Sequence, residues 1–329
     1  MSPARRRALI TGLTGQDGSF LAESLLDDGY EVIGLVHPGG SDDGSRLGLA
    51  ASLEDRISVL EGDLLRPESL RATVAEVQAD ELFHLAAPTF VPESWRHPAR
   101  TQAAIVVGTA TLLQAVRDDS PHTRVLVAAS AEMFGDAPES PQREDTPCRP
   151  RTPYATAKLA AHQLVGQLRG HDGIFACSAI LYNHESERRP EAFVTRKITR
   201  TAAAIKLGLA DELILGDTGA VRDWSFAGDI MRGCRLMLAH DTPGDYILAS
   251  GIGHTVADLL DVAFGHLGLN PADHVRTDPE LVRAPEVTAP VGDPSRARAE
   301  LGWAPTLTFE QLVARMVDAD LADLGGSAR

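Results

Sequence analysis

The chain has 329 residues, of which 43% are hydrophobic, and it carries a formal net charge of −15 at pH 7. This length allows two lobes that share one core, the negative charge disfavours nucleic acid as a partner, and no apolar run is long enough to span a bilayer, so membrane insertion is not expected. The three cysteines, Cys148, Cys177 and Cys234, lie far apart, which predicts free thiols and no metal site.

Strand-like and helix-like segments alternate through the first half of the chain. The N-terminus runs directly into the first of them, without the apolar core and cleavage site of a signal peptide, which predicts a cytoplasmic protein. The alternation predicts an α/β fold with a doubly wound parallel sheet of the Rossmann type. Its expected strands cover residues 8–11, 30–36, 57–61, 81–86, 124–130, 173–182 and 245–250.

The remainder of the chain predicts a smaller, C-terminal substrate-binding lobe. From residue 183 onward the sequence is richer in charge, proline and glycine, with helix-like segments at 193–207 and 309–324. Because strand 245–250 follows a long excursion, we expect this lobe to be discontinuous. The expected division is a dinucleotide-binding domain of residues 1–182 plus roughly 226–250, and a substrate lobe of residues 183–225 and 251–329.

A glycine-rich turn follows the first expected strand. Gly12, Gly15 and Gly18 precede a helix-like segment at 19–28. Glycines at such a turn let the backbone approach a pyrophosphate, which then rests on the free N–H groups of the helix N-terminus. The turn therefore predicts a nicotinamide dinucleotide site. The other residues expected at this site are Thr14, Gln16, Asp17, His37, Arg46, Asp63, Leu64, Leu85, Ala86, Ala87, Tyr154, Lys158 and Leu181.

The choice between NAD and NADP stays open at this stage. An acidic residue at the end of the second strand would bind the ribose hydroxyl of NAD, whereas an arginine there would pair with the 2′-phosphate of NADP. The strand ends in Val36-His37-Pro38, which offers neither. Arg46 is the nearest cation that could reach a phosphate, and a solvated loop arginine is an equal alternative.

Four polar residues predict oxidation and elimination at one centre. Tyr154 and Lys158 share one face of a helix, and the lysine ammonium favours the phenolate, so Tyr154 is expected to act as a base near neutral pH. Ser130 ends the fifth expected strand and would orient the same substrate oxygen. If the backbone stays extended, Glu132 projects to the same side as Ser130. A carboxylate there would supply the base that elimination of water beside a ketone requires.

These residues lie in segments that resemble GDP-mannose 4,6-dehydratases, which are extended short-chain dehydrogenases/reductases. Ser-Ala-Glu-Met-Phe-Gly at 130–135 and Pro-Tyr-Ala-Thr-Ala-Lys at 153–158 follow the family pattern, as does the glycine turn. The likeness continues through residues 175–186, 193–199, 222–224 and 292–303.

The resemblance implies an activity and a set of binding residues. The implied reaction converts GDP-mannose to GDP-4-keto-6-deoxymannose, with NADP slightly favoured over NAD, in a homodimer or homotetramer. The residues that it implies for the GDP-sugar are Thr89, Glu132, Asn183, Thr195, Lys197, Leu215, Gly216, Arg222, Arg283 and Glu286.

The chain departs from the family pattern in four places. An Arg-Arg-Ser-Ser-like segment is replaced by residues 37–40, and a Gln-Ser-His segment by Pro88-Thr89-Phe90. Ala131 replaces a serine, and residues 283–288 read Arg-Ala-Pro-Glu-Val-Thr. The alternative functions are a nucleotide-sugar 4-epimerase or 4-ketoreductase, neither of which needs a C5 base, and a catalytically silent, dinucleotide-binding regulatory protein.

Overall fold

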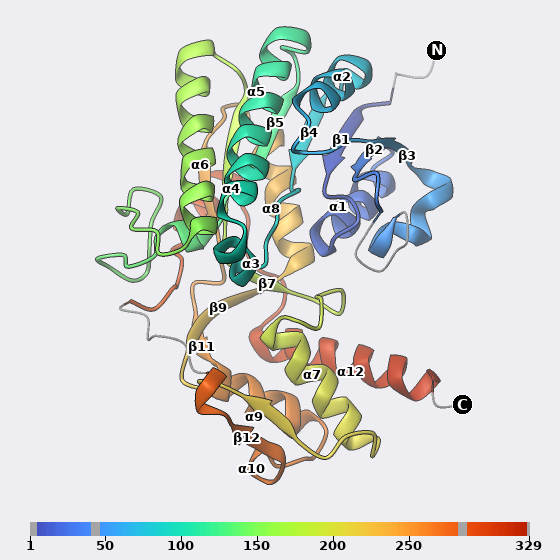
Figure 1. Ribbon diagram of the computed structural model, residues 1–329, viewed down its shortest axis with the longest axis vertical. Helices are drawn as coiled ribbons and strands as arrows, with labels where there is room; N and C mark the ends of the chain where they lie inside the picture. The colour runs from blue at the N-terminus through green and yellow to red at the C-terminus, as the bar shows by residue number, and fades with distance from the viewer. Residues whose placement is uncertain (1–4, 41–46, 282–287, 328–329) are drawn as a thin grey trace.

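A seven-stranded parallel sheet forms the larger part of the computed structural model, which describes residues 5–40, 47–281 and 288–327 (Figure 1). The strand order is β10-β6-β5-β4-β1-β2-β3, with a crossover after every strand, so the predicted Rossmann-type sheet is confirmed. The strands are β1 (Arg7–Thr11), β2 (Glu31–Val36), β3 (Ser58–Glu61), β4 (Glu81–His84), β5 (Arg124–Ala128), β6 (Ala176–Leu181) and β10 (Asp245–Leu248).

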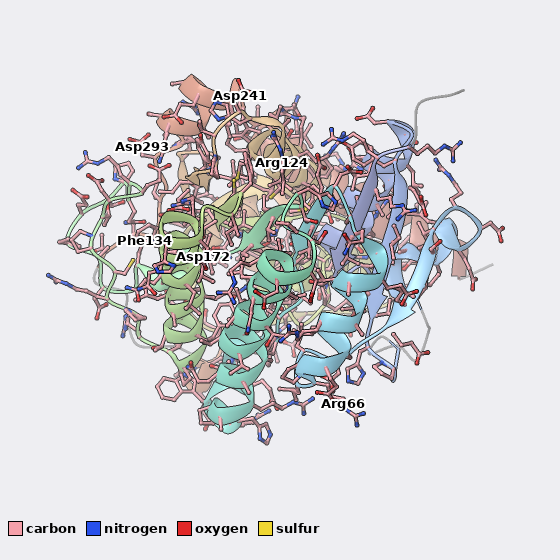
Figure 2. The ribbon with its side chains drawn as sticks, turned by 90° about the horizontal axis from the view of Figure 1, so that it is seen from above. Arg66, Arg124, Phe134, Asp172, Asp241 and Asp293 are labelled. Carbon is pink, nitrogen blue, oxygen red and sulfur yellow. The ribbon has the colours of Figure 1, made fainter. Side chains whose placement is uncertain are left out.

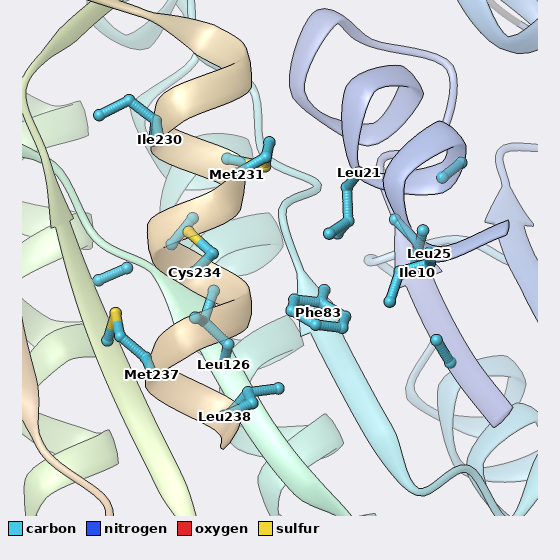
Figure 3. Packing of buried hydrophobic residues seen from close by; sticks show 14 of the residues in the cluster. Ile10, Leu21, Leu25, Phe83, Leu126, Ile230, Met231, Cys234, Met237 and Leu238 are labelled. Atoms are coloured by element: carbon cyan, nitrogen blue, oxygen red, sulfur yellow. The ribbon is translucent and has the colours of Figure 1, made fainter. Parts of the chain in front are cut away.

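Helices cover both faces of this sheet. Alternate residues of each strand face opposite sides: Ile10 packs toward α1 (Gln16–Asp27) and α8 (Ala227–Ala239), as Figure 3 shows, whereas Leu9 packs on the other face. That other face is covered by three helices, which Figures 1 and 2 show side by side. They are α2 (Pro67–Val77), α5 (Gly108–Asp119) and α6 (Pro153–Asp172).

Several of the remaining segments pack around a separate apolar cluster beyond the sheet, which we call the second cluster. Helices α7 (Val194–Lys206), α9 (Val256–His266) and α12 (Phe309–Ser327) pack around it. The smaller strands beside them are β7 (Asn183–Glu185), β8 (Leu213–Leu215), β9 (Val221–Phe226), β11 (Gly253–Thr255) and β12 (Val275–Thr277). The other short elements are η1 (Gly48–Arg56), α3 (Val91–Arg96), α4 (Pro98–Gln102), η2 (Ala103–Val107), η3 (Ala131–Met133), α10 (Pro271–His274), η4 (Pro279–Leu281) and α11 (Ser295–Leu301).

All seven expected strands are present, and most end earlier than the sequence predicts. β4 ends at His84 and β5 at Ala128, where backbone atoms begin to bond to side chains: Ala86 N donates to Thr11 Oγ1, and Ala128 O accepts from Lys158 Nζ. The first helix begins at Gln16, three residues before the predicted start, since the Gly15 carbonyl already accepts a bond from Ser19 N. Among the described residues, no helix is long and apolar enough to cross a membrane.

Candidate active site

The glycine turn lies at the carboxyl edge of the sheet, between β1 and α1. Gly12 adopts φ +80°, and Gly15 N donates to its carbonyl at 3.2 Å. A Cβ on Gly12 would lie 2.8 Å from Ala86 N, and a Cβ on Gly18 would lie 2.2 Å from Gly12 O, so only glycine fits at either position. The turn thus brings the N-terminus of α1 to the strand ends as a tight backbone cradle, which fits a pyrophosphate.

Side chains from the β7 segment fix this turn from the other side. Gln16 Nε2 donates to His184 O at 3.1 Å, and Ser186 Oγ donates to Gln16 Oε1 at 2.7 Å. His184 Nε2 lies 2.9 Å from Asp17 Oδ2. Burial opposes the charged form of both groups, but their mutual attraction outweighs it, so the pKa of Asp17 is lowered and that of His184 is raised. Sequence reasoning missed His184, whose only signal was its place in a family-like segment.

The other predicted cofactor residues are spread along the same edge. His37 Nε2 and Asp63 Oδ2 lie 3.9 Å apart at the ends of β2 and β3. The Thr14 carbonyl accepts a bond from Leu49 N, and Leu181 is buried in the core beside the sheet. The half-buried residues Leu64, Leu85, Ala86 and Ala87 follow β3 and β4, and Arg46 lies outside the described residues.

A buried histidine supports the turn at the end of β4. His84 Nδ1 lies 2.8 Å from Thr11 Oγ1, which in turn accepts a bond from Ala86 N at 3.2 Å. Burial, reinforced by the Lys158 charge, lowers the pKa of His84 to about 3, so its imidazole is neutral. His84 therefore holds the end of β4 against Thr11, the residue before the glycine turn, and sequence reasoning missed it.

The predicted catalytic residues converge at the start of α6. Thr152 caps the helix, its Oγ1 accepting a bond from Ala155 N at 3.0 Å. Tyr154 and Lys158 are both buried, and Lys158 Nζ lies 5.9 Å from the tyrosine ring centroid. Lys158 Nζ donates to Ala128 O at 2.6 Å, which ties the lysine to the end of β5.

Ser130 and Glu132 lie beside Tyr154, but not on an extended strand as expected. Residues 131–133 form a 3₁₀ turn, and Ser130 Oγ caps it by accepting a bond from Glu132 N at 3.3 Å. Burial raises the pKa of Tyr154, a hydrogen bond with Ser130 opposes this rise, and the Glu132 charge adds to it. The structure thus brings the hydroxyl and the carboxylate to the tyrosine through a capped turn.

The pKa of Tyr154 moves opposite to the predicted direction. Burial raises it to about 12, while burial lowers the pKa of Lys158 to about 8. The lysine does not offset the loss of the water that would solvate a phenolate. Burial therefore keeps the Tyr154 hydroxyl protonated near neutral pH in this structure.

Arg189 is a further cation beside the tyrosine that sequence reasoning missed. Its charge partly opposes the rise that burial causes in the pKa of Tyr154. Arg189 Nε lies 3.1 Å from Glu185 Oε2, although the two atoms are not aligned for a hydrogen bond. The guanidinium stacks 3.6 Å over the ring centroid of Phe193. Arg189 lies just past a family-like segment, which was the only sequence signal for it.

The predicted sugar-binding residues form two groups in the structure. Asn183 on β7 pairs with Trp224 of β9, the strand that also carries Arg222. Lys197 on α7 donates to Ile214 O at 2.7 Å, and a Cβ on Gly216 would lie 2.4 Å from Leu281 O. This second group also contains buried Leu215.

Two other predicted sugar contacts, Thr195 and Thr89, lie apart from these groups. Thr195 is 2% exposed, and its hydroxyl donates to Glu185 Oε2 at 2.6 Å, so this side chain is bonded inside the protein. Thr89 is exposed after β4. Arg283 and Glu286 lie outside the described residues.

Comparison with known proteins decides the family. The model of the GDP-mannose 4,6 dehydratase family matches residues 9–316. The chain belongs to this family. It is 44% identical over 326 residues to GDP-mannose 4,6 dehydratase 1 of Arabidopsis thaliana, covering 96% of this chain and 90% of that protein. It is 39% identical over 349 residues to the GDP-mannose 4,6-dehydratase of Yersinia enterocolitica, with 96% and 94% covered.

One of the similar solved structures contains a bound cofactor. RMD from Pseudomonas aeruginosa, complexed with NADPH, has a TM-score of 0.80 and 26% identity, covering 97% of this chain and 99% of that one. The family resemblance predicted from the sequence is confirmed.

Proposed function

We propose that this protein converts GDP-mannose to GDP-4-keto-6-deoxymannose, a net loss of one water. The observation that carries the proposal is the carboxylate of Glu132 beside Ser130 and Tyr154, close enough for its charge to raise the pKa of the tyrosine. A 4-epimerase or a 4-ketoreductase needs no base for the sugar C5 proton, and a silent regulatory protein needs no buried tyrosine–lysine pair. The curated relatives are named as GDP-mannose 4,6-dehydratases, in agreement with this assignment.

The strand ends fit a nicotinamide dinucleotide. Gly12, Gly15 and Gly18 would hold its pyrophosphate at the N-terminus of α1, since a Cβ at the first or the last of them would fill the cradle. When bound, the nicotinamide would supply the redox chemistry of the reaction, the uptake and return of one hydride. The family favours NADP, although β2 ends without the arginine that would mark it.

The chain's own residues move the protons. Tyr154 accepts the proton of the C4 hydroxyl, and Ser130 donates a hydrogen bond to the ketone oxygen that forms. The ketone acidifies the C5 proton, which Glu132 removes. Glu132 then gives this proton to the departing C6 hydroxyl, so that water leaves and the carboxylate is restored. C5 regains a proton when C6 gains its hydrogen, and this uptake balances the proton that Tyr154 accepted from the C4 hydroxyl. Lys158, fixed on Ala128 O, keeps positive charge near the phenolate.

The residues of the smaller lobe would hold the GDP-sugar. Lys197 and Arg222 supply positive charge for the diphosphate in a chain that is negative overall. Asn183, Thr89, Leu215, Gly216, Arg283 and Glu286 complete the proposed set. Thr195 would act indirectly, because its hydroxyl is bonded to Glu185. The division into a dinucleotide domain and a substrate lobe belongs to the same proposal.

A homodimer through α5 and α6 is proposed for the assembly. Residues 101–116 contain no charged side chain, nor do residues 159–168. The two helices lie side by side on one face of the molecule, as Figures 1 and 2 show, and Val107 is 50% exposed there. A charge-free helical surface of this kind favours burial against a second copy. A tetramer and the cytoplasmic location remain predictions.

The variant Glu132→Gln tests the proposed function. Without the carboxylate, we expect dehydration to fall by about 10²–10⁴-fold, while C4 oxidation still occurs and reduced nicotinamide accumulates. Mass spectrometry of the products and the near-ultraviolet absorbance of the reduced ring measure these two steps separately. The matched control is Glu68→Gln, in the exposed first turn of α2. Dehydration at the wild-type rate in Glu132→Gln would contradict the proposal.

A further inference from the structure

An aromatic contact joins the two parts of the molecule beside the catalytic residues. Phe90 follows β4 and precedes α3, whereas Phe193 precedes α7 in the smaller lobe. Their ring centroids lie 6.4 Å apart with an interplanar angle of 81°, an edge-to-face arrangement. The contact therefore connects the loop after a central strand of the large sheet to the first turn of a helix in the second cluster.

The ring of Phe193 is held in place from within its own lobe. The Arg189 guanidinium covers it at 3.6 Å, and Arg189 is in turn paired with Glu185 at 3.1 Å. Glu185 is 2% exposed and also accepts the hydroxyl of Thr195. These contacts fix the ring of Phe193, and the ring of Phe90 packs against it.

The contact lies close to the reacting groups. Arg189 acts electrostatically on Tyr154, and Val91, the residue after Phe90, packs against the cluster that contains Tyr154. Thr89, on the other side of Phe90, is a proposed sugar contact. Yet Phe90 remains 42% exposed, so its ring adds little to the core. Because the ring lies close to the reacting groups and adds little to the core, we assign it a role in the reaction rather than in folding.

We propose that Phe90 and Phe193 form a clasp that retains the 4-keto sugar until the reaction is complete. This inference rests on the proposed dehydratase function. After C4 oxidation the sugar has given two electrons and its C4 hydrogen to the bound nicotinamide, and its hydroxyl proton to Tyr154. A sugar that escapes at this point leaves the enzyme with a reduced cofactor, unable to begin another cycle. Phe90 touches no reacting atom, so it is a positioning residue.

The test compares three variants of the holoenzyme during turnover of GDP-mannose. Phe90→Ala removes the clasp, and Phe90→Tyr keeps the ring. Trp95→Ala is the matched control, since it removes an aromatic ring that is 62% exposed on α3, the helix that follows Phe90. We expect Phe90→Ala to release a GDP-4-ketohexose that still carries its C6 hydroxyl, to accumulate reduced nicotinamide, and to show a KM raised about three- to tenfold. Phe90→Tyr and Trp95→Ala should release only complete product.

Hydrogen exchange provides a readout that does not depend on turnover. In protein without sugar, the peptide covering residues 187–197 should exchange about three- to tenfold faster in Phe90→Ala, because the contact that limits its opening is lost. Trp95→Ala should leave this peptide unchanged.

The outcomes separate the clasp from the proposed function. If wild-type protein makes the dehydrated product and Phe90→Ala makes only the same product, with oxidised cofactor and unchanged exchange, the clasp is refuted and the dehydratase stands. If the wild-type protein does not convert GDP-mannose, the proposed function fails and the retention role fails with it.

Discussion

The two parts of the molecule hold their functional side chains by different means. At the carboxyl edge of the large sheet, side chains bond to backbone atoms, as Lys158 does to Ala128 O and Thr11 to Ala86 N. In the smaller lobe, polar side chains hold one another, as in the buried group of Asp320, Arg196 and Thr199 between α7 and α12. The geometry of the first region thus follows from topology, whereas that of the second depends on pairs of side chains from distant segments.

The largest effect is expected from Tyr154→Phe. This variant keeps the bonds between side chains and backbone at the edge of the large sheet and removes only the proton acceptor. We expect kcat to fall by about 10²–10⁴-fold, and no reduced nicotinamide to form, because the first step is blocked. The measurement is single-turnover absorbance of the reduced ring. The free energy of unfolding should change little, since the ring still packs against Ile105 and Ala157. Full activity in Tyr154→Phe would show that another group accepts the C4 hydroxyl proton.

The next largest effect tests the side-chain network of the smaller lobe. Asp320 is fully buried and pairs with Arg196 at 2.7 Å, so Asp320→Ala would leave a cation without its partner. We expect a loss of about 3–5 kcal/mol in the free energy of unfolding. The control Asp323→Ala removes a carboxylate with 58% side-chain exposure and should cost at most about 1 kcal/mol.

Tryptophan fluorescence during urea unfolding can localise this loss. Trp224 is buried in the second cluster, and Trp303 is buried against the large sheet. If the smaller lobe depends on the network of Asp320, Arg196 and Thr199, Asp320→Ala should lower the urea concentration at which the Trp224 signal changes more than that at which the Trp303 signal changes. Single-tryptophan variants separate the two signals, and coincident shifts would show that both parts unfold as one unit.

The smallest effect is a pH dependence at the point where the two parts meet. The raised pKa of His184 stabilises the fold below about pH 6.5, and this contribution is lost as the pH rises through the folded pKa. The lowered pKa of Asp17 stabilises it above about pH 3.9, and this contribution is lost as the pH falls through the folded pKa. The pair therefore contributes most between these values.

The variant Asp17→Asn measures this contribution. We expect it to cost about 1–2 kcal/mol in the free energy of unfolding near pH 5.5, and less near pH 9, because His184 loses its charge as the pH rises through its raised pKa. Urea unfolding of the cofactor-free protein at the two pH values provides the comparison. An equal loss at both values would mean that the His184 charge plays no part in stability.

The edge of the large sheet and the smaller lobe also differ in how much of each could be predicted from the sequence. The positions of the strands along the chain, the glycine turn and the spacing of Tyr154 and Lys158 could be predicted, because periodicity and one helix turn determine them. The sequence did not reveal that burial would raise the pKa of Tyr154, which depends on packing of the whole sheet edge.

In the smaller lobe, residue types were predicted more easily than roles. Thr195 was expected at the sugar, yet its hydroxyl is bonded to Glu185, which comes from the preceding strand. Arg189 and His184 reach the catalytic edge only because β7 returns to the glycine turn. The spacing of residues along one segment does not predict these positions, because they depend on contacts between residues far apart in the chain.

The most direct test of the central claim is to incubate the purified protein, loaded with NADP, with GDP-mannose and to identify the product by mass spectrometry and proton NMR. We predict a product lighter by one water, with a new C6 methyl signal and no net change in the cofactor. A product of unchanged mass with an inverted sugar carbon would instead identify an epimerase and contradict the role assigned to Glu132.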